Sequence, residues 1–259
     1  MPMNMFNHKN GYYLTAGEAQ IYVEETGSPD GYPVIFLHGG LGSICDYSPF
    51  VGKIDTRFRC IGIDTRGHGM STRGSEPLTY ELLEKDTAEV LRQLNISRCA
   101  ITGFSDGGII AMRLGISKPQ LISHLIGIGA DWNPPDATLQ ALFSSLTIDS
   151  WKNKFPETIE LYERLNPNPD FSNLMQAVIR MWLDLTPSGY PGKRVQALKC
   201  QTLIIRGDAD PFLPLRHCAE LHQEIPDAHF LNVPFAGHAA HITHAEAVGA
   251  FINQFLNRD

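Results

Sequence analysis

The 259-residue sequence has few cysteines, no long apolar run and no excess of positive charge. It has five cysteines, an odd number, and they are widely spaced and form no C-x-x-C pair. This pattern is more typical of reduced thiols in a cytosolic protein than of a disulfide framework or a zinc site. The apolar runs fall far short of the roughly 20 residues that a membrane-spanning helix needs. The start of the chain predicts neither a signal peptide nor a membrane anchor, so a cytoplasmic location is expected.

Basic residues are outnumbered, with 21 Lys and Arg against 28 Asp and Glu and a formal net charge of -7. Binding to a phosphate backbone needs clustered Lys and Arg, and the sequence has no basic stripe, so no nucleic-acid partner is expected. The length fits one large α/β domain with an insertion, and the apolar content is near the globular average. The expected partner is a small-molecule substrate, and the expected state is a monomer or a homodimer.

Short apolar segments rich in Ile, Val and Leu alternate with longer segments of helical periodicity, as a parallel sheet with crossover helices requires. Such continuous apolar strands are typical of a sheet that helices cover on both faces. After an N-terminal hairpin within residues 11–26, the sequence predicts strands at 33–37, 60–63, 99–102, 125–129, 202–205 and 229–233. Helical periodicity predicts helices over 78–94, 216–224 and 244–256.

Residues 133–192 interrupt this alternation, because they contain no convincing strand and two helical stretches, at 158–165 and 174–185. The sequence therefore predicts a core formed by residues 1–132 and 193–259 and a helical cap inserted at 133–192. Aromatic side chains in and beside the cap are candidates to line an apolar pocket or to pack cap against core, namely Trp132, Trp151, Phe155, Tyr162, Trp182 and Tyr190.

A G-x-S-x-G motif spans Gly103 to Gly107, between the end of an apolar strand and the start of an apolar helix. In this context glycines allow a sharp turn, and the serine projects from the top of the sheet next to a helix N-terminus that favours negative charge. Ser105 is therefore the predicted nucleophile. The alternative is a glycine-rich turn in which the serine only caps the helix.

A serine hydroxyl needs a neutral imidazole to accept its proton and a carboxylate to orient that imidazole. His238 follows the last predicted strand, from which a side chain can reach over the top of the sheet, and it is the predicted base. Two carboxylates, Asp208 and Asp210, follow the preceding strand. Asp210 is the predicted acid and Asp208 the alternative. The histidines within helix or strand patterns, among them His217, are expected on the surface or in packing.

An H-x-x-H-x-x-H run at His238, His241 and His244 raises the alternative of a metal site. No H-E-x-x-H motif or cysteine cluster accompanies it, and the spacing does not keep three rings on one strand face. Neither a metal nor another cofactor is expected. His241 is predicted to support the site or to cap a helix.

The oxyanion of an acyl-transfer intermediate needs two fixed N–H donors, for which Gly40 and Asp106 are the candidates and Leu41 an alternative. The candidate substrate-binding residues are Leu41 and Phe104, which adjoin these donors in the sequence, and Trp182 of the insertion. The Asp106 carboxylate either binds a substrate cation such as an amine, pairs with a scaffold arginine, or serves as a favourable charge at a helix N-terminus.

The motifs together resemble the α/β-hydrolase superfamily, in the group with a short helical cap, over about residues 12–256. The resemblance implies an α/β fold with a mostly parallel central sheet, helices on both faces and an inserted cap. It also implies that Asp64, Arg66 and His68 are scaffold residues. The motifs that carry it are LHGGLGS (37–43), DTRGHGMS (64–71), GFSDGG (103–108), GDADPFLP (207–214) and GHAAH (237–241).

The resemblance implies hydrolysis of a carboxylic ester, thioester or lactone of a small to medium, largely apolar substrate through an acyl-enzyme on Ser105. Serine at the turn disfavours the dehalogenase and epoxide-hydrolase activities that this superfamily runs from an aspartate nucleophile. Since one fold hosts many reactions, alternatives remain. They are a C–C bond hydrolase, a cofactor-free haloperoxidase-like enzyme and a slow-turnover ligand sensor.

Overall fold

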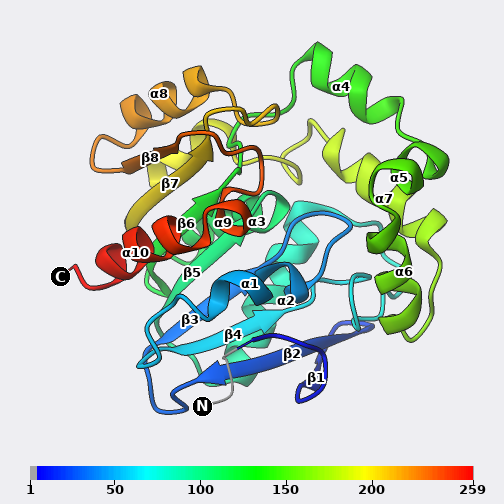
Figure 1. The fold of residues 1–259 in the computed structure, drawn as a ribbon, viewed down its shortest axis with the longest axis horizontal. Helices are drawn as coiled ribbons and strands as arrows, with labels where there is room; N and C mark the ends of the chain where they lie inside the picture. Colours follow the sequence, from blue (N-terminus) through cyan, green and yellow to red (C-terminus); the bar gives the residue numbers. More distant parts are fainter. Residues whose placement is uncertain (1–4, 259) are drawn as a thin grey trace.

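The computed structural model describes residues 5–258, which form one eight-stranded sheet in the order β1-β2-β4-β3-β5-β6-β7-β8 (Figure 1). The first two strands form an antiparallel hairpin, β2 pairs antiparallel with β4, and the other neighbours run parallel. The predicted α/β-hydrolase architecture with a mostly parallel sheet is therefore confirmed. The strands are β1 (Tyr12–Ala16), β2 (Ala19–Gly27), β3 (Pro33–Leu37), β4 (Arg59–Ile63), β5 (Cys99–Phe104), β6 (Ile122–Ile128), β7 (Gln201–Gly207) and β8 (His229–Val233).

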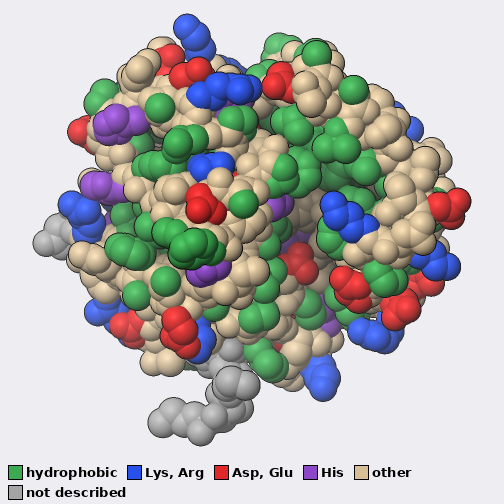
Figure 2. All heavy atoms as spheres, turned by 45° about the horizontal axis from the view of Figure 1, so that its top comes forward, with side chains coloured by type: hydrophobic (Ala, Val, Ile, Leu, Met, Phe, Trp, Pro, Cys, Tyr) green, Lys and Arg blue, Asp and Glu red, His purple; other side chains and the backbone are tan. Residues whose placement is uncertain are grey.

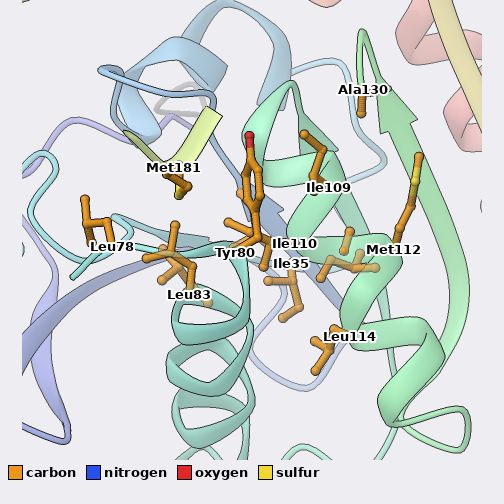
Figure 3. Packing of buried hydrophobic residues seen from close by; sticks show 14 of the residues in the cluster. Ile35, Leu78, Tyr80, Leu83, Ile109, Ile110, Met112, Leu114, Ala130 and Met181 are labelled. Atoms are coloured by element: carbon orange, nitrogen blue, oxygen red, sulfur yellow. The ribbon is translucent and has the colours of Figure 1, made fainter. Parts of the chain in front are cut away.

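Each face of the sheet has its own apolar core, because successive side chains of a strand point to opposite faces. In β3, Ile35 and Leu37 belong to the cluster formed with α2 (Tyr80–Gln93) and α3 (Asp106–Ser117). Val34 and Phe36 belong to the cluster on the other face, with α1 (Ser48–Val51) and α10 (Ala245–Leu256). Figure 3 shows Tyr80 and Leu83 of α2 close to Ile35 and to the apolar residues of α3. Helices thus bury both faces of β3.

Several element boundaries differ from the predictions by one to three residues, and the end of β6 and the start of α2 do so for local reasons. The strand predicted at 125–129 begins earlier, at Ile122, and ends at Ile128, because Gly129 adopts a φ of 59°. A left-handed residue cannot continue the strand, and glycine adopts this conformation without steric cost. The helix predicted at 78–94 begins at Tyr80, since the Thr79 side chain accepts a hydrogen bond from Leu82 N and caps the helix.

Four α-helices lie between β6 and β7, where the sequence predicted two (Figure 1). The missed helices are α4 (Ala137–Ser144) and α5 (Ile148–Lys154), which bury none of their residues. Their apolar residues, such as Phe143 and Trp151, are only partly buried, and helices this short give periodicity little to reveal. They are instead capped, α4 by Asp136 and α5 by Thr147.

The other two helices between β6 and β7 are α6 (Pro156–Leu165) and α7 (Phe171–Trp182). The helix predicted at 174–185 is α7, which begins and ends three residues before the predicted bounds. The division into core and cap stays a prediction, and residues 1–4 and 259 of the predicted core lie outside the described residues. The remaining short elements are η1 (Ile44–Tyr47), η2 (Gly192–Ala197), α8 (Leu215–Glu224) and α9 (Ala240–Thr243).

Within residues 5–258, no helix has the length and apolar character needed to cross a membrane. The cysteine thiols are free, with three of them buried and two half-buried. The buried ones are Cys60, Cys99 and Cys218.

Candidate active site

Ser105 occupies the sharp turn between β5 and α3, with φ 50° and ψ -116°. Small neighbours make this turn possible, because a Cβ on Gly103 would lie 2.2 Å from the carbonyl oxygen of Gly107. The backbone N–H of Ser105 donates to Ile128 O at 2.8 Å, which ties the turn to the end of β6. In the described chain the Ser105 side chain makes no capping hydrogen bond to α3. Ser105 is thus the N-cap residue by position, but its hydroxyl does not cap the helix, and the half-buried residue is held in a strained turn.

Asp210 and His238 form a hydrogen-bonded pair beyond the carboxyl ends of β7 and β8. The two carboxylate oxygens each lie 3.0 Å from His238 Nδ1. One of them also accepts from Phe212 N at 2.9 Å, which fixes the carboxylate, and Asp210 is buried. Asp208 is exposed on the same loop and makes no contact with His238 in the described chain. When Nδ1 donates to Asp210, the Nε2 atom of His238 is left as the proton acceptor.

Apolar groups surround the His238 ring. Its centroid lies 4.9 Å from that of Phe104 and 4.8 Å from that of Phe212. A Cβ on Gly129 would lie 2.9 Å from His238 Nδ1, so the residue after β6 has to be glycine for the ring to fit. Since Ser105 is bonded to Ile128 at the end of the same strand, the nucleophile and base candidates both lie at the carboxyl end of β6, although no hydrogen bond joins them among the described residues.

The loop that contains Gly40 packs against the start of α3. A Cβ on Gly40 would lie 2.4 Å from Asp106 Oδ2 and 2.7 Å from Trp182 Cζ2. The two residues predicted to donate to an oxyanion are therefore neighbours. Asp106 is the first residue of α3, where backbone N–H groups lack partners within the helix. Leu41 has a φ of 62°, in the left-handed region that is uncommon for leucine, so the backbone of this loop is strained.

The Asp106 carboxylate binds two neutral donors, Tyr80 Oη at 2.8 Å and Trp182 Nε1 at 2.9 Å. Burial raises the pKa of Asp106 to about 6, although the hydrogen bonds from Trp182 and Tyr80 oppose the increase. Among the described residues it forms no ion pair with lysine or arginine, so the alternative of a pair with a scaffold arginine is wrong, whereas its place at the start of α3 agrees with the helix N-terminus alternative. Sequence reasoning missed Tyr80, since helical periodicity identified its helix but not its partner across the fold.

The chain matches the family described as alpha/beta hydrolase fold over residues 32–188 and the family described as TAP-like protein over residues 174–258. It belongs to the α/β-hydrolase family. An AB hydrolase superfamily protein of Bacillus subtilis is 28% identical, over 95% of this chain and 99% of that protein.

Two solved structures have the same fold as this α/β-hydrolase. The meta-cleavage product hydrolase of Pseudomonas fluorescens IP01 superimposes with a TM-score of 0.82 at 20% identity, covering 97% of this chain and 99% of that one. The enol-lactonase of Burkholderia xenovorans LB400 superimposes with a TM-score of 0.76 at 19% identity, covering 95% of this chain and 100% of that one. At such identities the likeness concerns the fold, and one fold supports different reactions.

The three substrate-binding candidates of this α/β-hydrolase have different surroundings. Leu41 is buried and lines a cavity of about 330 Å³ together with residues of α6, and Phe104 is half-buried against the His238 ring. Trp182 is 9% exposed, and its ring lies 5.0 Å from that of Phe143. Sequence reasoning missed Phe143, because α4 was not predicted.

The H-x-x-H-x-x-H histidines of the α/β-hydrolase lie in three different surroundings. His241 is fully buried among the rings of Phe104, Tyr47 and Phe50, and burial lowers its pKa to about 3. It therefore supports the Phe104 ring from behind, whereas His244 is the N-cap residue of α10. Across the described residues, no group of three His, Cys, Asp or Glu side chains is placed to hold a metal ion.

Proposed function

We propose that this α/β-hydrolase cleaves a carboxylic ester, thioester or lactone of a small to medium, largely apolar substrate through an acyl-enzyme on Ser105. The observation that carries the proposal is the Asp210–His238 hydrogen-bonded pair at 3.0 Å, on the same edge of the sheet as the strained Ser105 turn. A nucleophile, a base and an orienting carboxylate in this relation form a general arrangement for acyl transfer.

The proposed reaction has two halves. His238 Nε2 accepts the Ser105 hydroxyl proton while Oγ attacks the acyl carbon, and the backbone N–H groups of Gly40 and Asp106 stabilise the oxyanion. His238 then returns the proton to the leaving group. In the second half, His238 accepts a proton from a water molecule, and the water oxygen attacks the acyl carbon. The bond from that carbon to Ser105 Oγ breaks, His238 returns the proton to Oγ, and the acid is released. Asp210 keeps the imidazole in the required tautomer throughout.

The preference for an apolar substrate rests on the surroundings of the site. Phe104 and Phe212 flank His238, and Leu41, next to the Gly40 donor candidate, lines the cavity beside α6. Figure 2 shows hydrophobic side chains gathered on the side of the molecule where Figure 1 places the cap helices. Asp106 is already bonded by Tyr80 and Trp182, which supports a structural role for its carboxylate and weakens the alternative of a substrate cation. We also propose residues 133–192 as the cap, whereas the cytoplasmic location and the oligomeric state stay predictions.

The test is hydrolysis of p-nitrophenyl esters from acetate to laurate, with covalent labelling by a fluorophosphonate. We expect wild-type protein to turn over the esters and to be labelled, and Ser105→Ala to lose both. Labelling of Ser105 without turnover of any ester would instead favour a C–C bond hydrolase, a haloperoxidase-like enzyme or a slow-turnover sensor. Absence of labelling in the folded wild-type protein would contradict Ser105 as the nucleophile.

A further inference from the structure

A second nucleophile–imidazole–carboxylate chain lies outside the candidate active site and shares no residue with it. Cys45 Sγ is 3.1 Å from His8 Nδ1, and His8 Nε2 is 2.6 Å from Asp64 Oδ2. Cys45 belongs to η1, His8 to the segment before β1, and Asp64 follows β4. Three parts of the chain thus meet in a Cys-His-Asp arrangement.

The carboxylate end of this chain is rigidly held. Besides His8, Asp64 accepts hydrogen bonds from Ile44 N at 2.9 Å and from Met70 N at 2.8 Å, and it is fully buried. Burial opposes the charge of Asp64, but the hydrogen bond and the positive charge of His8 outweigh burial and lower its pKa. Asp64 is therefore an ionised and immobile partner for the imidazole.

The imidazole is held as firmly as the carboxylate. His8 has a φ of 59°, its backbone N–H donates to Glu24 Oε2 at 2.7 Å, and its ring stacks on Tyr22 with centroids 5.3 Å apart. Burial opposes protonation of the ring, but the hydrogen bonds to Asp64 and Cys45 outweigh it and raise the pKa of His8 to about 10. A left-handed residue held by contacts on every side is typical of functional sites.

Cys45 differs from the other cysteines in its surroundings. Cys60, Cys99 and Cys218 are buried, and burial raises the pKa of each of these thiols to about 12. Cys200 is half-buried like Cys45, but its neighbour is the hydroxyl of Thr202 at 3.9 Å, and burial raises its pKa. Among the described cysteines, Cys45 alone combines partial exposure with an imidazole at hydrogen-bond distance.

The charged groups around the thiol are of both signs. The Nδ1 atom of His8 faces the thiol. On the other side of His8, Asp64 contacts Nε2 of the ring and Glu24 accepts from the backbone N–H. Asp46 is the next residue of η1, and burial raises its pKa to about 7, which reduces its negative charge near neutral pH. The imidazole is therefore the group that favours a thiolate, against the acidic groups behind it.

We propose that Cys45 is a modification site, at which His8 and Asp64 stabilise a thiolate–imidazolium pair that reacts with hydroperoxides and small alkylating agents. With hydrogen peroxide, the thiolate sulfur attacks one peroxide oxygen, and an S–O bond forms while the O–O bond breaks. The departing hydroxide takes the proton of His8 and leaves as water. Sulfur is oxidised to the sulfenic acid, and the peroxide is reduced.

The test is the rate at which iodoacetamide alkylates each cysteine of the intact wild-type protein, followed by peptide mass spectrometry. Cys200 is the matched internal control because it is also half-buried. At about pH 6 we expect Cys45 to react at least about tenfold faster than Cys200, and its rate to change little up to about pH 8. In His8→Gln the rate at Cys45 should fall and then rise about tenfold per pH unit, as for an ordinary thiol.

A second readout does not depend on the His8 variant folding. Wild-type protein is treated with hydrogen peroxide and then with dimedone, which traps sulfenic acids, and the adduct is expected on Cys45 and absent from Cys200. The thiolate absorbance of wild type minus Cys45→Ser gives the titration of the same thiol. Alkylation of Cys45 no faster than that of Cys200 at about pH 6, or a dimedone adduct on Cys200 instead, would overturn the proposal.

Discussion

The molecule contains two nucleophile–histidine–aspartate groups that differ mainly in access to solvent. In the first, the His238 side chain is 21% exposed and pairs with Asp210 at 3.0 Å. In the second, the His8 side chain is 1% exposed and pairs with Asp64 at 2.6 Å. Both aspartate side chains are fully buried. The nucleophiles also differ, serine in the first group and cysteine in the second, and we expect the two groups to act differently according to whether a substrate can reach the imidazole.

The charge of the imidazole is the second difference. A base that accepts a proton from serine has to be neutral, whereas a protonated ring stabilises an anion next to it and can donate its proton to a leaving group. The partners of His8 keep it protonated, since they raise its pKa to about 10. We therefore expect turnover at Ser105 and stoichiometric modification at Cys45.

Removal of each nucleophile gives the largest expected contrast. Ser105→Ala should lower kcat/KM for p-nitrophenyl esters by up to about a million-fold, as removal of a triad nucleophile does elsewhere. Cys45→Ser, the matched variant at the second group, should stay within about twofold of wild type, because it leaves the Ser105 turn intact. Steady-state kinetics of the two purified variants measure this, and a Cys45→Ser protein as inactive as Ser105→Ala would break the comparison.

Replacement of the orienting carboxylate should have the next largest effect. Asp210→Asn is expected to lower kcat by about ten-thousand-fold, because an amide no longer selects the tautomer in which Nε2 is free. Asp208→Asn on the same loop is the control, and it should change little because Asp208 is exposed. The same ester assay measures both. An equal loss of kcat in the two variants would mean that activity depends on the loop as a whole and not on the contact between Asp210 and His238.

Loss of the second imidazole should affect stability more than activity. His8→Gln leaves the buried Asp64 charge unpaired and should cost about 3–5 kcal/mol of unfolding free energy. Since the pKa of His8 is raised in the folded state, its contribution is complete below the unfolded value of about 6.5 and is lost as pH rises towards about 10. Urea unfolding across this range measures the difference, with exposed His222→Gln as the control. A difference that grows with pH would contradict the ion pair.

A smaller effect is expected at Asp106, the buried carboxyl beside Ser105 that belongs to neither group. Its pKa is raised to about 6, so ionisation between about pH 4 and 6 should lower the folded-state stability, by about 3 kcal/mol. In Asp106→Asn this loss is absent, and the variant should become relatively more stable as pH rises. Urea unfolding at several pH values measures it. Trp182→Phe is the companion variant, because it removes one hydrogen bond to the carboxylate and should steepen the loss.

The sequence by itself determined the features that depend on short stretches of chain. The alternation of apolar strands with helices predicted the mostly parallel sheet, because helices on both faces require continuous apolar strands such as β3. The glycines around Ser105 predicted the sharp turn. At position 103 there is no room for a side chain, because a Cβ there would meet the backbone of α3. The helices α4 and α5 were beyond this reasoning, because they are short and their apolar residues, such as Phe143 and Trp151, are only partly buried.

Only the tertiary structure decided which distant side chains meet. The sequence favours Asp210 over Asp208 but leaves both open, and the contact of Asp210 with His238, 28 positions away, separates them. Trp182 lies 76 positions from Asp106, and His8 lies 37 positions from Cys45 and 56 from Asp64. Hydropathy periodicity describes which face of an element is buried but not the element that covers it. The order of the strands in the sheet and the packing of the helices bring these residues together. Burial and the neighbouring groups then decide which of them are charged.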